Sequence, residues 1–576
     1  ILPILTCVTS VVMMLGWLSW IDWRLTVISS NFVALLLIIA LAITIHLLVR
    51  YREFHAANPD LPQSDLVMRT VVFMARPCLY TTLTTVVAFV SLVVSDIRPV
   101  IDFGWMMSIG LLLALMLAFI IIPAGLMLAP KGEPRDKGDN SAAFTTRFST
   151  FTERHQAMVL WLSVVIAIVS AYGISRLEVE NRFIDYFHKS TEIYRGMTVI
   201  DQSLGGTITL DVIIDVDPGL LEDEYVLSAG GVANEDDPFG EADAFDEADP
   251  FADAEPFAEV DAFAEDDPFS EQNPEAQPRN SYWFSVAGLE EVRALHDYLD
   301  SLPEVGKIQS VATAFQVAND INGERLNDFE LALLKQSLPE EITSVLVRPY
   351  LSESANQTRI AMRIKETDPN LRRAELIEKI RRHAIDELGF KEDQVHFSGL
   401  LVLYNNMLQS LFSSQIVTLG AVFIGIMMMF LVLFRSVSLA LIAIVPNMLA
   451  ASVVLGAMGL LNIPLDMMTI TIAAITVGIG VDDTIHYIHR FKTEFARDGD
   501  YIGAMHRAHA SIGRAMFYTS VIIVVGFSIL AASKFIPSIY FGLLTGLAMF
   551  AAILAALTLL PRLILLVKPL SAPADS

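Results

Sequence analysis

Long apolar runs alternate with polar connections along most of this 576-residue chain. A helix needs about 20 predominantly apolar residues to cross the hydrocarbon core of a bilayer, and ten runs reach or approach that length. They cover about residues 1–20, 25–49, 77–95, 102–129 and 157–175, and, after a long polar interval, 413–434, 437–461, 465–489, 513–532 and 538–567. The pattern predicts a polytopic α-helical membrane protein with ten spans.

The polar interval predicts a folded domain outside the membrane. Residues 207–216 and 360–365 have the β-branched composition of strands, whereas 289–302 and 371–388 carry apolar residues at helical spacing. We therefore expect an α+β domain over about 176–412. Its apolar faces either form its core or line a substrate path.

A low-complexity insert occupies about 232–280 of that domain. Six phenylalanines recur at intervals of six residues in an acidic, Pro-containing background: Phe239, Phe245, Phe251, Phe257, Phe263 and Phe269. Such a composition predicts disorder. The segment is either a solvated loop expanded by repetition or a series of Phe anchors for a hydrophobic partner groove.

Clusters of Lys and Arg orient the spans, because basic loops mark the cytoplasmic side. They fall within 50–76, 131–154 and 490–514, which leaves 176–412 on the opposite side. The expected order is a four-span block (1–130), a cytoplasmic linker (131–156), a span (157–175), the external domain (176–412), a second block of five spans (413–568) and a cytoplasmic tail (569–576). Since Ile1 lies within an apolar run and no initiator Met precedes it, we expect the first span to be truncated.

The two membrane blocks form a parallel internal repeat. Residues 74–82 align with 512–520, and at the same offset Pro99, Phe103, Gly104 and Pro123 match Pro537, Phe541, Gly542 and Pro561. Residues 44–46 likewise match 484–486. Duplicated halves are common in transporter folds, so the repeat favours that class of protein.

Two adjacent carboxylates, Asp482 and Asp483, lie within the span predicted at 465–489, whereas the matching positions of the first block hold Ala42 and Ile43. Ionisable groups at membrane depth are costly and are functional candidates by default. A carboxylate pair of this kind can take up and release protons. The alternative is a purely structural buried pair.

Helical spacing places His486 four residues after Asp482, and Tyr487 four after Asp483. Imidazole and phenol groups can pass protons or hold a carboxylate, so both join the predicted relay. Gly478 and Gly480 would allow a neighbouring helix to approach closely. Thr44 and His46 are candidate contributors from the facing helix, or else ordinary buried polar residues.

Composition and motifs argue against several other classes of function. The net charge of -26 comes largely from the acidic insert, and nucleic acid is not expected as a partner. The two cysteines, Cys7 and Cys78, indicate neither a disulfide framework nor a Cys-based metal site. We find no nucleophile elbow, phosphate-binding Gly loop or zinc-spaced His set, so we expect no enzyme, no metal and no cofactor.

The Gly-x-x-x-Asp-Asp sequence at 478–483, together with the parallel repeat around a large external loop, resembles the RND superfamily of transporters, and within it the MMPL and Patched-like branch, which carries sterol-sensing-type spans. The resemblance implies twelve spans in the complete protein and porter-like periplasmic domains. It implies a multi-pass inner-membrane secondary transporter that exports hydrophobic or lipid-like molecules and is driven by proton entry at Asp482 and Asp483. Many relatives have polar or acidic residues where this chain has Ala42 and Ile43.

Membrane lipids and a lipid-like substrate are the expected partners, and a homo-oligomer and a periplasmic partner are left open. Two alternatives keep the same spans. The first is a lipid sensor or scaffold without cargo flux, and the second is a proton-driven helper of protein translocation. The acidic pair argues against the sensor, because a sensor needs no proton coupling.

Overall fold

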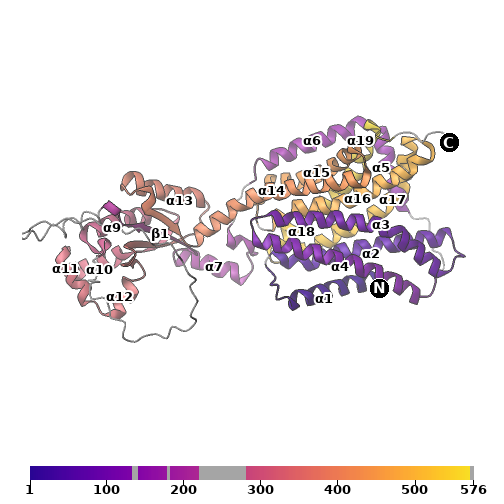
Figure 1. Ribbon diagram of the computed structural model, residues 1–576. Coiled ribbons are helices and arrows are strands. Elements are labelled where there is room, and N and C mark those ends of the chain that lie inside the picture. The colour runs from indigo at the N-terminus through magenta and orange to yellow at the C-terminus, as the bar shows by residue number, and fades with distance from the viewer. Residues whose placement is uncertain (27, 133–139, 178–181, 220–280, 467, 571–576) are drawn as a thin grey trace, which may run out of the picture. The chain divides into compact units, whose positions relative to one another are not determined.

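The computed structural model of the chain (Figure 1) describes residues 1–26, 28–132, 140–177, 182–219, 281–466 and 468–570. These residues form two compact units: a helical unit of residues 1–199 and 403–576, and a second unit of residues 200–402. The acidic Phe-repeat segment predicted at 232–280 lies outside the described residues.

The helical unit contains a helix at each of the ten predicted spans. They are α1 (Leu2–Trp20), α2 (Phe32–Ala57), α3 (Gln63–Val90), α4 (Arg98–Leu128), α6 (Gln156–Ile174), α14 (Leu400–Phe434), α15 (Val437–Leu460), α16 (Thr469–Asp498), α17 (Tyr501–Ser528) and α18 (Ile536–Leu557), which α19 (Leu559–Val567) continues. Among the described helices, nine are long and apolar enough to cross a membrane. The tenth, α16, is less apolar because it carries the two carboxylates.

Several helices extend beyond the apolar runs that predicted them. The helix α3 begins at Gln63, α14 begins at Leu400, and α16 continues to Asp498. An apolar run predicts only the part of a helix that lies in lipid. The helix itself continues, through its backbone hydrogen bonds, until a capping residue or a helix-breaking residue ends it. An additional helix, α5 (Asn140–Arg154), lies where the sequence predicts a linker, and it packs against α17.

The predicted parallel repeat is confirmed by matching geometry in the two blocks. After α3 comes the 3-10 turn Ser91–Val94 and then α4, and after α17 comes the 3-10 turn Ile529–Ala532 and then α18. Phe89 and Phe103 meet edge to face with ring centroids 6.0 Å apart, and their counterparts Phe527 and Phe541 do so at 6.1 Å. A Cβ at Gly104 would lie 2.6 Å from the Phe89 carbonyl oxygen, and a Cβ at Gly542 would collide with that of Phe527.

The second unit is an α+β domain, as predicted. Its antiparallel sheet has the order β2-β4-β1-β5, with β3 paired to β4. The strands are β1 (Ile208–Asp215), β2 (Val305–Gln309), β3 (Leu351–Ser352), β4 (Gln357–Ile364) and β5 (Val395–Ser398), and the longer helices are α9 (Val286–Asp300), α10 (Val311–Asn322), α11 (Asp328–Ser337), α12 (Glu340–Leu346) and α13 (Arg373–Arg382). Alternate side chains of β1 and β4 are buried and form the core together with α9 and α13.

A buried carboxylate ties the sheet of this unit together. Asp201, at the end of α7 (Glu192–Ser203), accepts hydrogen bonds from Thr207, from the backbone N–H of Glu366 and from Thr367. Burial works to raise the pKa of Asp201, but these donors outweigh it and hold that pKa below its usual value. The group is structural, since it fixes the ends of β1 and β4.

Candidate functional site

The centre of the helical unit is α16, which packs against α3, α15, α17 and α18. From Thr469 to Val481 its side chains are buried throughout. A Cβ at Gly478 would lie 2.5 Å from the Ala88 Cβ of α3, and one at Gly480 would lie 3.0 Å from Asn447 Oδ1 of α15. Thr85 of α3 also donates a hydrogen bond of 3.1 Å to the Gly478 carbonyl. The two glycines therefore lie where α16 meets its neighbours most closely.

Asp482 lies between two imidazoles. His486, one turn further along α16, has its Nε2 3.2 Å from Asp482 Oδ1, and His46 of α2 has its Nε2 3.6 Å from Asp482 Oδ2. The imidazole rings stack with centroids 4.9 Å apart. Both rings are more than nine-tenths buried, while the Asp482 side chain is 24% exposed. The carboxylate side chain is thus less buried than either imidazole.

Asp483 faces a different helix. Its Oδ2 accepts a hydrogen bond of 3.0 Å from the Ser520 hydroxyl of α17. The next residue, Thr484, accepts a hydrogen bond of 3.1 Å from the Asn447 amide of α15. Three consecutive residues of α16 therefore contact α2, α17 and α15 in turn.

Tyr487 and Thr44 are not placed beside the carboxylates in the contacts that the structure shows. The Tyr487 hydroxyl lies 3.2 Å from Nδ1 of His509 on α17, and His509 Nε2 lies 3.0 Å from the Leu557 carbonyl. The Thr44 hydroxyl donates to the Leu41 carbonyl of its own helix. Only His46, of the two candidates on α2, reaches Asp482.

Sequence reasoning did not single out Ser520, Asn447 or His509. A signal for Ser520 existed, because it ends the repeated segment 512–520 and matches Thr82 of the first block. Asn447 and His509 follow no such pattern. Their partners depend on which helices become neighbours, which spacing along one helix does not reveal.

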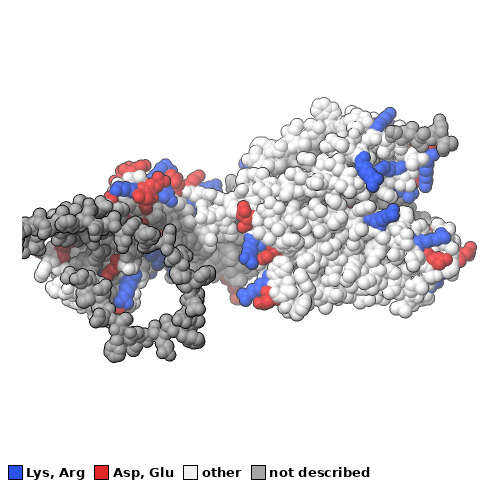
Figure 2. Space-filling view, viewed as in Figure 1, with Lys and Arg blue, Asp and Glu red and all other residues white. Residues whose placement is uncertain are grey.

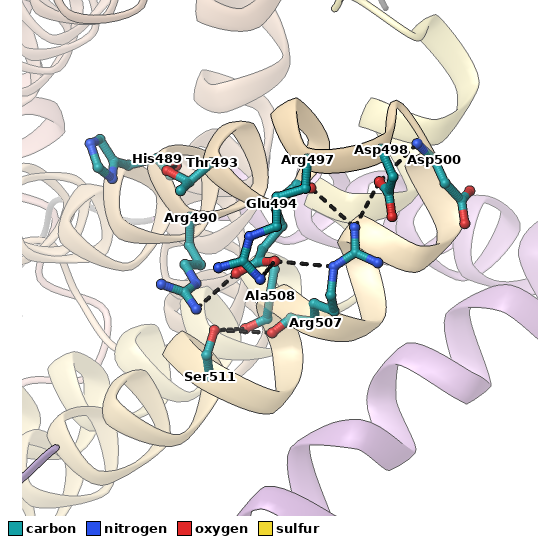
Figure 3. A network of polar contacts seen from close by, with 10 residues as sticks. All are labelled: His489, Arg490, Thr493, Glu494, Arg497, Asp498, Asp500, Arg507, Ala508 and Ser511. Carbon is teal, nitrogen blue, oxygen red and sulfur yellow. Dashed lines mark hydrogen bonds and ion pairs between the residues drawn. The ribbon is translucent and has the colours of Figure 1, made fainter. Parts of the chain in front are cut away.

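A buried glutamate fixes the end of α16 to the beginning of α17 (Figure 3). Glu494 forms ion pairs with Arg490 at 2.8 Å, Arg497 at 2.8 Å and Arg507 of α17 at 3.1 Å. Arg507 also pairs with Asp498 at 2.8 Å. The network holds the turn between the two helices, so a movement of α16 would also involve α17.

The same structure shows where a metal could be held. His46, Asp482 and His486 each offer a ligand atom, and these atoms lie within 4.8 Å of one another. The set equally suits proton exchange, since a carboxylate between two imidazoles can accept a proton from either side.

Parallel repeats of helices around an intramembrane carboxylate pair are typical of a polytopic transporter of the RND type. The chain belongs to the MMPL family, whose model matches residues 1–174 and 304–573. The predicted membership of the RND superfamily, in its MMPL branch, is confirmed.

Two curated proteins are similar in sequence. A membrane protein of Methanocaldococcus jannaschii, MJ1562, is 27% identical over 287 residues, which cover 48% of this chain and 70% of that protein. The hopanoid transporter HpnN of Burkholderia multivorans is 33% identical over 123 residues, which cover 20% of this chain and 14% of HpnN.

A solved structure with the same fold is that of SecDF, a translocon-associated membrane protein from Thermus thermophilus. It matches 98% of this chain with a TM-score of 0.52 and 12% sequence identity. The chain corresponds to 58% of the length of SecDF. At this identity the likeness shows the fold alone.

Proposed function

We propose that this chain acts in the proton-driven export of hydrophobic or amphiphilic, lipid-like molecules. The observation that carries the proposal is the division of partners around two adjacent carboxylates of one membrane helix. Asp482 contacts His46 of α2, whereas Asp483 contacts Ser520 of α17. Protonation of Asp482 changes the contact of α16 with α2, and protonation of Asp483 changes its contact with α17.

In this proposal the coupling begins at Asp482, because its carboxylate lies between the imidazoles of His46 and His486. A proton that reaches it neutralises the charge between His46 and His486 and weakens the attraction between α2 and α16. Because α2 also packs against α17, a shift at this contact also reaches α17, whose Ser520 donates a hydrogen bond to Asp483. The proton gradient supplies the energy, and no cofactor is proposed.

Support for apolar cargo comes from two sources. The chain is similar to part of a protein named as a hopanoid transporter. In addition, the α+β unit contains a cavity of about 420 Å³ between α9 and the helices α10 to α12. Its lining is almost wholly apolar and includes Phe284, Leu289, Val311, Phe315, Ile321 and Leu338. A cavity of this size and lining suits an acyl or polycyclic chain.

The distribution of charge supports a multi-pass orientation in the inner membrane. Figure 2 shows that one face of the helical unit carries almost no charge between its two ends. Arg50 and Arg52 near the end of α2, with Arg490 and Lys492 of α16, mark what we call the basic end. The proposal places the basic end in the cytoplasm and residues 200–402 in the periplasm.

Two other functions share this fold. A lipid sensor would bind lipid without moving protons, and a translocation helper would act on a protein chain. The likeness to SecDF does not favour the second, because it extends to the fold alone. The two intramembrane carboxylates favour proton coupling over the first, because a sensor needs no ionisable pair at membrane depth.

The proposal is tested with full-length protein in proteoliposomes that hold a pH-sensitive dye and a fluorescent lipid. Wild type is compared with Asp482→Asn and Asp483→Asn at equal protein content. Asp102→Asn is the matched control, since Asp102 is a half-buried carboxylate near the beginning of α4.

We expect both site variants to lose proton flux and lipid movement by at least about tenfold, which corresponds to about 1.4 kcal/mol in the transport barrier. The control should transport as wild type does. Unchanged lipid movement in a variant that carries both Asp482→Asn and Asp483→Asn would refute the relay. Tight lipid binding without flux in wild type would establish the sensor.

A further inference from the structure

The helices α6 and α15 are in backbone contact near the end of α6, and a groove lies beside both helices nearer its beginning. Near the end of α6, Gly173 meets the backbone of Gly456 so closely that a Cβ could not be added, and Gly459 meets Gly173 in the same way. Glycines of this kind bring membrane helices into backbone contact. Val159 lies fourteen residues earlier on α6, or roughly 20 Å along the axis. Val159 lines the groove described next.

The space that opens between them is an apolar groove of about 680 Å³. Its walls come from α5, α6, α15, α18 and the beginning of α19, and they include Phe151, Leu162, Ile166, Val453, Phe550 and Ala551. The volume is in the range of pockets that hold small molecules. Since the groove lies between membrane-spanning helices, its occupant must be apolar along most of its length.

One end of the groove is positively charged. Among the described residues that line it, Arg147 of α5 is the one charged side chain. Arg147 is exposed and has no ion-pair partner within the part of the chain that the structure describes. Arg562 of α19 lies near the same end, where it donates to Gln156 at the beginning of α6. Trp161, 70% exposed on α6, matches the aromatic residues found at headgroup depth.

We propose that this groove is a binding site for one anionic phospholipid of the leaflet at the basic end. The acyl chains occupy the wedge between α6, α15 and α18, and the phosphate lies at Arg147. Basic pockets between membrane helices are suited to anionic headgroups. The site does not depend on export, because it concerns a lipid that stays in the groove.

The test counts the phospholipid that stays with the protein. Full-length protein is reconstituted in nanodiscs of equal phosphatidylglycerol and phosphatidylcholine, released, and examined by native mass spectrometry. Arg147→Gln removes the charge, and Ala551→Trp fills the wedge. Arg154→Gln is the control, since Arg154 is an exposed arginine of the same helix outside the groove.

We expect wild type and the control to retain one phosphatidylglycerol per chain, about fivefold in preference to phosphatidylcholine. The preference should disappear in Arg147→Gln, and retention of either lipid should fall in Ala551→Trp, with unchanged size-exclusion profiles. Equal retention of both lipids by wild type, many loosely held copies, or a preference that survives in Arg147→Gln would overturn the proposal.

Discussion

Asp482 and Asp483 are neighbours in sequence but not in surroundings. The first lies between two imidazoles, while the second accepts a hydrogen bond from the Ser520 hydroxyl of α17. Adjacent residues of a helix point about 100° apart, so they meet different neighbours. The site can therefore respond to a single proton without both carboxylates changing their partners.

His46 gives the sharpest test at the scale of one residue. We expect His46→Gln to slow proton-coupled lipid movement by about tenfold, because it removes the only imidazole that α2 presents to Asp482 among the contacts described. His55→Gln is the matched control, since His55 is equally buried on the same helix. Rates are measured in proteoliposomes at equal protein content. Equal slowing by both variants would show that buried histidines of α2 matter only for folding.

The site could be predicted from the sequence only in part. The pairing of Asp482 with His486 follows from a spacing of four residues within one helix. The same spacing predicted Tyr487 beside Asp483, whereas the hydrogen-bond partner of its hydroxyl in the structure is His509 of α17, 3.2 Å away. The repeat contained a signal for Ser520 as a position, but its pairing with Asp483 depends on tertiary packing between helices.

At the scale of elements, the closeness of α16 to α3 determines how the site is held. The Gly478 backbone lies against Ala88 and Thr85, and this contact comes one turn before the carboxylates. A side chain here would push the helices apart. The Glu494 network fixes the other end of the same helix, so α16 is held on both sides of the site.

We expect Gly478→Ala to destabilise the helical unit by about 1–3 kcal/mol, because its Cβ would lie 2.5 Å from that of Ala88. Gly420→Ala on α14 is the control, as a Cβ there meets nothing within 4 Å. It should be neutral or slightly stabilising, since alanine favours helices. Thermal unfolding in detergent compares the two. Equal melting temperatures would show that α3 and α16 separate without cost.

The elements themselves were largely predictable. In the described part of the chain a helix lies at each of the ten predicted apolar runs, and β1, β4 and α9 appear where the pattern placed them. The ends were less accurate, as at Leu400, where α14 begins before the apolar run. The helix α5 was missed because its apolar residues form only one face and no continuous run.

At the scale of the whole molecule, two similar blocks carry unequal chemistry. Both repeat the order of helices and the Phe pair at the 3-10 turn. Only the second block has the carboxylates, and the first contributes His46. This asymmetry is consistent with the proposed mechanism, in which proton binding at the second block moves that block relative to the first.

The central claim is that a proton gradient drives lipid-like cargo through this protein. The most direct measurement imposes a pH difference across proteoliposomes that contain equal fluorescent lipid on both sides. We predict net movement of the lipid opposite to the protons, reversal when the pH difference is reversed, and no net movement in the variant with Asp482→Asn and Asp483→Asn. Net lipid movement that does not depend on the direction of the pH gradient, or that persists in this variant, would contradict the account.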